Sequence, residues 1–138
     1  MEPARADSMA KPILDLETLL RTLADRTRLR LLNLMRDREV CVCYFVETLQ
    51  TSQPKISRHL AYLRRSGLVS ARREGLWQHY SIVPPADAAV ARVLRETLNA
   101  MSSNKEAERD LQRLDRACCN PMKFVKLQPA PVPGKRLP

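Results

Sequence analysis

The sequence of 138 residues lacks any continuous apolar run of about 18 residues, the length a helix needs to cross a bilayer. It also lacks a secretory signal, because residues 1–10 hold one arginine, two acidic residues and no apolar segment. No internal repeat is present. These absences predict a chain that does not span a membrane and that stays in the reducing cytoplasm.

Acidic residues are scarce beside basic ones, 15 Asp and Glu against 24 Lys and Arg, for a net charge of +9. A sequence pI near 10.0 favours a polyanionic partner, nucleic acid first and an anionic membrane surface second. The chain also contains four cysteines. In a reducing compartment such cysteines are more typical of metal ligands or redox sensors than of structural disulfides.

Composition divides the chain into three parts. Residues 1–11 are polar without periodicity and predict a flexible N-terminal arm. Residues 120–138 hold half of the ten prolines, four basic residues and no acidic one, which predicts a disordered tail. Residues 12–119 therefore carry the single folded domain.

Apolar residues at helical spacing predict four helices in the first half of this domain. Five leucines between residues 14 and 23 indicate a first helix of about three turns. Asp25 or Thr27 caps a second helix with a broad buried face, and a short third helix covers about 43–50. A tight connection leads to a fourth helix, which carries Pro54 in its first turn and stops at Gly67.

The pattern then changes to two predicted strands, 68–73 and 76–83, joined at Glu74 and Gly75. A further helix follows, with apolar residues from Val90 to Met101. Two short helices joined by a tight turn and followed by a basic hairpin define a winged helix-turn-helix. The predicted fold class is thus mainly α with a small β-hairpin wing.

Basic charge is concentrated on the fourth helix and the hairpin, where residues 53–80 contain six Lys or Arg and one Glu. Helical spacing turns Ile56, Leu60 and Leu63 toward the core. The residues left for a groove of double-stranded DNA are Gln53, Lys55, Ser57, Arg58 and His59. Arg72 and Arg73 in the hairpin suit contacts with phosphate or the minor groove.

Several segments, in this order, closely resemble the arsenic- and metal-responsive repressors of the ArsR/SmtB type. They are Leu-Ala-Asp-Arg-Thr-Arg-Leu (23–29), Cys-Val-Cys (41–43), Ser-Gln-Pro-Lys-Ile-Ser-Arg-His-Leu (52–60), Gly-Leu-Val (67–69) and Arg-Arg-Glu-Gly (72–75). The resemblance covers about residues 16–101. It implies a homodimeric repressor whose first and last helices pair across the dimer, which needs no cofactor to bind its operator and which leaves it on metal capture. It also implies that the five groove residues lie in the recognition helix, with Arg72 and Arg73 in the wing.

The cysteines predict the inducer. Thiolates select soft ions such as As(III), Sb(III), Cd(II) or Cu(I), and repressors resembling this one bind As(III), Cd or Pb through the pair that matches Cys41 and Cys43. We expect the nearby helix N-terminus to lower the thiol pKa of Cys43. Side chains two apart diverge in a helix and converge in an extended chain, so chelation by both sulfurs predicts an unwound helix start.

The sequence departs from the best-known arsenic pattern, which has a third cysteine where Val46 stands. Cys118 and Cys119 are expected to supply a further sulfur, because related repressors with a Cys-Cys pair in this region bind arsenite or methylarsenite there. No cysteine precedes Cys41, which argues against a four-sulfur Cd or Pb site. The predicted ligands are thus Cys41, Cys43, Cys118 and Cys119, and the predicted inducers are As(III), methylarsenite and Sb(III).

Three other functions fit part of the same sequence pattern. The first is a repressor that senses oxidation of the same thiols, and the second is a purely structural, nucleoid-type DNA binder. The third is a cysteine-dependent enzyme such as an arsenate reductase, which needs an anion-binding loop around its nucleophile. Residues 44–47 after Cys43 are apolar and then acidic without glycine, and there is no Cys-x-x-Cys, so no enzyme is predicted.

Overall fold

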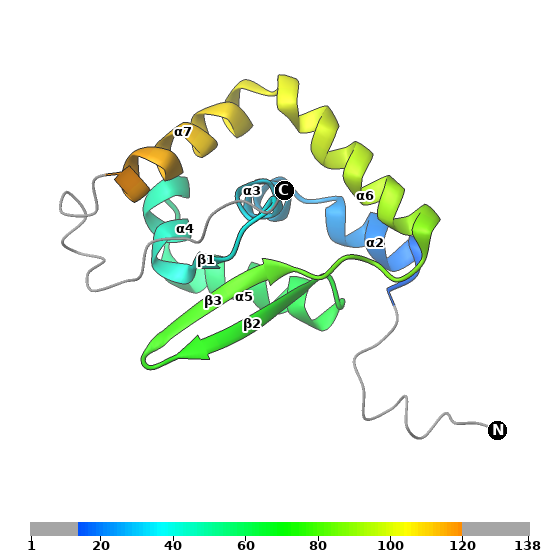
Figure 1. The fold of residues 1–138 in the computed structure, drawn as a ribbon, viewed down its shortest axis with the longest axis horizontal. Helices are drawn as coiled ribbons and strands as arrows, with labels where there is room; N and C mark the ends of the chain where they lie inside the picture. The colour runs from blue at the N-terminus through cyan, green and yellow to red at the C-terminus, as the bar shows by residue number, and fades with distance from the viewer. Residues whose placement is uncertain (1–13, 120–138) are drawn as a thin grey trace.

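The computed structural model describes residues 14–119, with side chains as far as Ala117, so the predicted arm and tail lie outside the described residues. The order of elements is α2 (Leu16–Leu23), α3 (Arg26–Leu34), β1 (Val40–Cys41), α4 (Val42–Leu49), α5 (Gln53–Arg65), β2 (Val69–Glu74), β3 (Trp77–Ile82), α6 (Ala88–Ala100), the 3-10 helix η1 (Met101–Ser103) and α7 (Lys105–Cys119). This confirms a mainly helical fold with a β-hairpin wing (Figure 1). Between residues 14 and 119 no helix is both long and apolar enough to span a bilayer.

Helix α3 is the centre of the fold and packs against α2, α4, α5 and α7 (Figure 1). Its leucines Leu31, Leu32 and Leu34 are completely buried, as their spacing predicted. The prediction that Ile56, Leu60 and Leu63 of α5 face the core is also confirmed, since at most 1% of each is exposed.

Short polar side chains fix where the helices start. Asp25, one of the two predicted caps, precedes α3 and accepts a hydrogen bond from Arg28 N at 2.9 Å. The first helix is shorter than predicted, because Asp15 caps it and it begins at Leu16. Its leucine stripe is also split, since Leu16 and Leu20 are about half exposed, at 48% and 51%.

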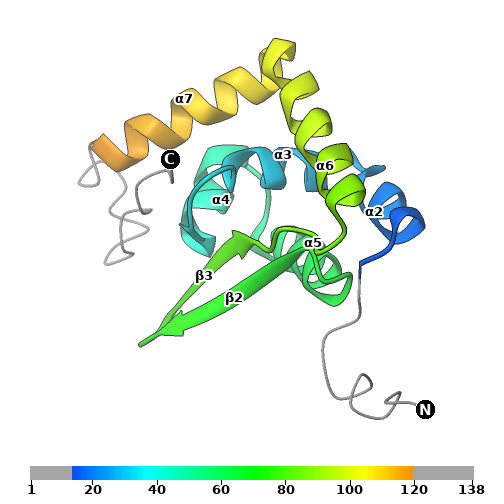
Figure 2. The same cartoon turned by 45° about the vertical axis from the view of Figure 1, so that its right-hand side comes forward.

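The three strands form one antiparallel sheet in the order β1-β3-β2. The hairpin turn lies one residue later than predicted, since Glu74 pairs with Trp77 and leaves Gly75 and Leu76 as the turn. Gly75 has a φ of 61°, a left-handed conformation that glycine adopts without strain. Strand β1 was not predicted, because two residues are too few to show a period. The hairpin projects away from the helices (Figure 2).

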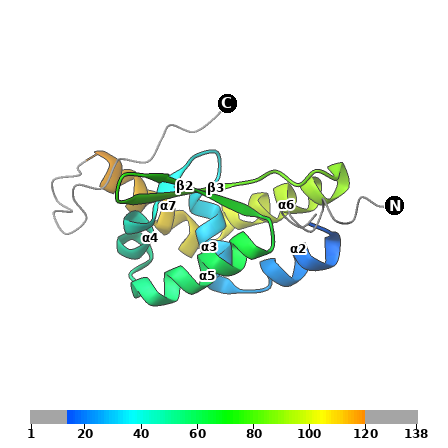
Figure 3. The same cartoon turned by 90° about the horizontal axis from the view of Figure 1, so that it is seen from below.

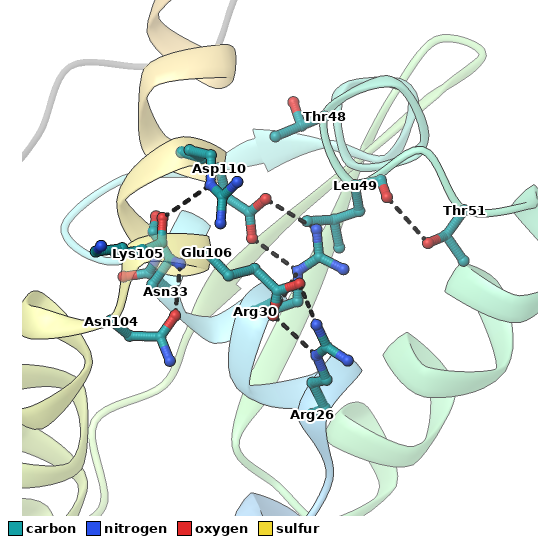
Figure 4. Close-up of polar contacts among 12 residues, drawn as sticks. Arg26, Arg30, Asn33, Thr48, Leu49, Thr51, Asn104, Lys105, Glu106 and Asp110 are labelled. Carbon is teal, nitrogen blue, oxygen red and sulfur yellow. Dashed lines mark hydrogen bonds and ion pairs between the residues drawn. The ribbon is translucent and has the colours of Figure 1, made fainter.

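Helices α6 and α7, linked by η1, form a bent arch over α3 and α4 (Figure 2). Helix α7 was not predicted as a separate element. Its buried face consists of two alanines, one aspartate and a single leucine, namely Ala107, Asp110, Leu114 and Ala117. Such a face keeps helical spacing but holds few large apolar residues, because polar contacts to α3 replace much of the apolar contact (Figure 4).

Candidate DNA interface and thiol site

Helices α4 and α5 form the helix-turn-helix. Helix α4 ends at Leu49, and Gln50 takes the left-handed conformation, with a φ of 51°, so that the chain turns within three residues. Ser52 caps α5 by accepting a hydrogen bond from Lys55 N at 3.4 Å, and Pro54 lies in the first turn as predicted. Figure 3 shows α5 and the β2–β3 hairpin converging at the end where α5 leads into β2.

Four of the five residues predicted to reach a DNA groove are exposed on α5, namely Gln53, Lys55, Ser57 and Arg58. His59 differs, because only 18% of its side chain is exposed and its Nδ1 lies 3.7 Å from Asp25 Oδ1. Burial lowers the pKa of His59 below its usual 6.5, although Asp25 opposes that shift. His59 is therefore neutral at pH 7 and adds no charge to the basic surface of α5.

Arg28 fixes the position of α5, a role that its sequence pattern did not reveal. Its guanidinium lies 4.0 Å from the centre of the Tyr62 ring on α5, which is cation–π geometry. The same side chain donates hydrogen bonds to Thr22 O at 2.7 Å and Arg21 O at 3.2 Å, at the end of α2. Arg28 thus joins α2, α3 and α5.

The wing presents both predicted arginines at the surface. Arg72 forms a two-pronged ion pair with Glu39, a residue that precedes β1, with an Nη2–Oε1 distance of 2.7 Å. Hydrogen bonds from Arg72 lower the pKa of Glu39, which is therefore ionised at neutral pH. Arg73 donates to the Gly75 carbonyl at 3.2 Å. At the tip, Leu76 is 85% exposed, a feature not singled out in the sequence.

The Cys41 and Cys43 thiols lie at the junction of β1 and α4. Cys41 is completely buried in extended conformation at the end of β1, and Cys43 is partly buried in the first turn of α4. Burial, followed by electrostatic interaction with the neighbouring Cys41, raises the pKa of Cys43 to about 11. The expectation of a lowered pKa was wrong, because loss of solvent outweighs the helix N-terminus.

The expected unwinding of the helix start on chelation stays a prediction, since α4 begins at Val42 in this structure. Cys41 is extended and lies before the helix, whereas Cys43 lies within its first turn. Val46, at the position of the missing third cysteine, lies one turn after Cys43 and is half-buried. Among side chains described as far as Ala117, no group of three His, Cys, Asp or Glu residues is placed to bind a metal.

The side chains of Cys118 and Cys119 lie outside the described residues, but the backbone of α7 is placed as far as Cys119. One turn earlier, Asp115 accepts a hydrogen bond from Arg38 at 3.0 Å, and Arg38 is three residues before Cys41. Arg113 donates to Thr48 O near the end of α4 at 3.3 Å. The last turns of α7 therefore lie against the segment that leads to the cysteine pair.

A helix-turn-helix with an exposed basic helix and an adjoining basic hairpin defines the class of winged-helix DNA-binding regulators. A model of the arsR family of bacterial regulatory proteins matches residues 25–71, from the start of α3 into β2. The arsenical resistance operon repressor of Escherichia coli is 47% identical over 79 residues, 56% of this chain and 68% of that protein. The arsenic resistance transcriptional regulator ArsR1 of Pseudomonas putida is 41% identical over 91 residues, 65% of this chain and 71% of that protein. The chain belongs to the ArsR family.

Solved structures agree with this fold. HlyU from Vibrio cholerae has a TM-score of 0.55 at 28% identity and covers 75% of this chain and 100% of its own. The transcriptional repressor BigR from Xylella fastidiosa has a TM-score of 0.53 at 26% identity and covers 75% of this chain and 95% of its own. The protein is thus a DNA-binding repressor of the ArsR family. The transcriptional-regulator names of its relatives agree with the prediction that it is not an enzyme.

Proposed function

We propose that this protein represses its operator as a homodimer and releases it when Cys41 and Cys43 capture a trivalent arsenical or Sb(III). The observation that carries the proposal is the position of these two free cysteines at the junction of β1 and α4, one element before the recognition helix. Both relatives described above carry arsenical resistance or arsenic resistance in their names. No oxidant is needed, because each thiol that forms an As–S bond displaces one hydroxide of As(OH)₃, which leaves with the thiol proton as water.

The donor set suits a ligand that needs two sulfurs. A methylated trivalent arsenical forms two further bonds, which Cys41 and Cys43 satisfy. Inorganic As(III) favours three sulfurs, so Cys118 or Cys119 is proposed to supply the third. The docking of α7 beside Arg38 supports a site completed within one chain.

The proposed dimer uses the first helix. Leu16 and Leu20 are one turn apart on α2 and leave about half of each side chain in water. Packing of α2 against the same helix of a second copy would remove both leucines from water. The proposed DNA contacts are Gln53, Lys55, Ser57, Arg58 and His59 of the recognition helix with Arg72 and Arg73 of the wing. A two-fold protein then contacts two half-sites.

The test is DNA release measured by fluorescence anisotropy, with the chain's own upstream DNA and a thiol-free reductant. Cys41→Ser and Cys43→Ser should each bind DNA as the wild type does and fail to release it with arsenite. Cys118→Ser and Cys119→Ser should weaken the response to arsenite more than the response to a methylated trivalent arsenical. Wild-type release by all four variants would contradict metalloid sensing and leave the repressor without an assigned inducer.

A variant with an added thiol tests the same proposal by a gain of arsenite response. Val46→Cys adds a thiol one helical turn from Cys43, on the same face, and should lower the arsenite concentration that releases DNA. Ser103→Cys, which adds an exposed thiol in η1, is the matched control and should leave that concentration unchanged.

Titration with peroxide in place of arsenite tests the alternative of a thiol redox sensor.

A further inference from the structure

The wing arginine Arg72 is held by a carboxylate that lies outside the wing. Arg72 Nε lies 3.1 and 3.2 Å from the two oxygens of Glu39, and Nη2 lies 2.7 Å from Oε1. This forked pairing occupies one edge of the guanidinium, the geometry that arginine also uses for phosphate. About half of the Arg72 side chain and a third of the Glu39 side chain remain exposed, so DNA phosphate has access to the pair.

The same carboxylate lies close to the cysteine pair. Glu39 is two residues before Cys41, on the segment that becomes β1. In the sheet Cys41 is opposite His79, and His79 is opposite Arg72, so the three form one row across the strands. Residues opposite one another in antiparallel strands share a face. The row therefore runs from the thiol site to the wing. Glu39 is near both ends of the row, since it lies two residues before Cys41 and is paired with Arg72.

We propose that Glu39 regulates the DNA affinity of the wing by competing with operator phosphate for Arg72. When DNA binds, Arg72 exchanges the carboxylate for phosphate. When a ligand at Cys41 and Cys43 fixes β1 in its present place, Glu39 keeps Arg72 and the wing loses a phosphate contact. This second step rests on the proposed function, whereas the competition for Arg72 does not.

The competition is tested with the full chain, without any inducer, by anisotropy titration of the upstream DNA at several salt concentrations. Glu39→Gln should bind DNA about two- to fivefold more tightly, the range expected for one exposed ion pair. The slope of its log–log salt dependence should match that of the wild type, because Arg72 contacts phosphate in both complexes. Glu108→Gln, which removes the same charge from an exposed position on α7, is the matched control. Glu39→Asp keeps the charge but shortens the side chain, and it should give an intermediate affinity.

Glu39 must act through Arg72, so its effect should vanish in an Arg72→Ala background. A gain in DNA affinity that survives in that background, a gain no larger than that of Glu108→Gln, or weaker DNA binding by Glu39→Gln would overturn the proposal.

The coupling between the thiol site and Arg72 is tested separately. Glu39→Gln should bind arsenite with wild-type affinity, followed by the ultraviolet absorbance of the As–S bonds, and should show an arsenite-induced change in DNA affinity that is about two- to fivefold smaller. If the arsenite-induced change in DNA affinity is the same in Glu39→Gln as in the wild type, the coupling is overturned. If the wild type does not bind arsenite, the proposed function alone is overturned.

Discussion

Arg30 of α3 and Asp110 of α7 form a buried two-pronged ion pair, with Nε 2.8 Å from Oδ2 and Nη2 2.9 Å from Oδ1 (Figure 4). Only 1% of Asp110 is exposed. Beside it, Arg26 pairs with Glu106, and Asn33 donates to Ala107 O at 3.1 Å. This row of polar contacts holds α7 on α3 and so determines where its C-terminal turns lie.

Replacement of Arg30 by Met should lower the free energy of unfolding by about 3–5 kcal/mol, because Asp110 would stay buried without its cation. Urea unfolding measures this change. The double variant Arg30→Met, Asp110→Leu should recover much of the loss, since both charges are then removed together. Arg26→Met is the control at the exposed pair and should change stability far less. Equal losses for Arg26→Met and Arg30→Met would show that burial of Asp110 is unimportant.

Alkylation of Cys43 by iodoacetamide should be slow at pH 7.5 and should accelerate as the pH approaches about 11, because the thiolate is the reacting form. Burial raises the pKa of this thiol, so the protonated form persists across the range in which an ordinary thiol ionises. Peptide mapping by mass spectrometry resolves Cys43 from the other cysteines. The urea-unfolded chain is the reference and should react at the rate of an ordinary thiol. A faster reaction in the folded protein would contradict the burial argument.

Arg58→Ala should weaken binding to the operator by about 1–3 kcal/mol if Arg58 reads a base, because a pairing to one base edge is lost. Anisotropy with operator and with scrambled DNA of equal length separates this role from a phosphate contact. A phosphate contact would weaken binding to both DNAs equally. Equal wild-type affinity for the two DNAs would contradict the assignment of α5 as the recognition helix.

DNA affinity should fall by about 10³–10⁵ between 50 and 200 mM salt, if two subunits together neutralise about 6–10 phosphates. The basic residues of α5 and the wing provide these contacts in the proposed complex. Footprinting of the same DNA should show two protected half-sites about 34 Å apart, one turn of the double helix. A nearly flat salt response, or one unsymmetrical half-site, would argue against this mode of binding.

Leu20→Glu should shift the protein to a monomer and weaken operator binding, because it puts a charge into the exposed apolar pair of α2. Light scattering after gel filtration gives the mass in solution. Leu76→Glu, an equally drastic change at the exposed wing tip, serves as control and should leave the mass unchanged. A Leu20→Glu protein that keeps the mass of a dimer would exclude this face of α2 as the interface.

Much of the helix-turn-helix was predictable because its signals are local. Ser52 and Pro54 indicate the start of α5, and the spacing of Ile56, Leu60 and Leu63 identifies its buried face. Capping and periodicity act over one or two helical turns, so one stretch of sequence contains the whole signal. The basic charge of α5 and the wing is likewise a property of the sequence itself.

Tertiary structure alone decided how distant segments meet. The burial of Cys43, the pairing of Glu39 with Arg72 and the position of His59 beside Asp25 all depend on elements that are far apart in the chain. Helix α7 escaped prediction because an ion pair and alanines, rather than a stripe of large apolar residues, attach it to α3. The sequence therefore determined which residues carry charge and thiols, and packing determined the charge states and partners of those residues, because desolvation and ion pairing act through space.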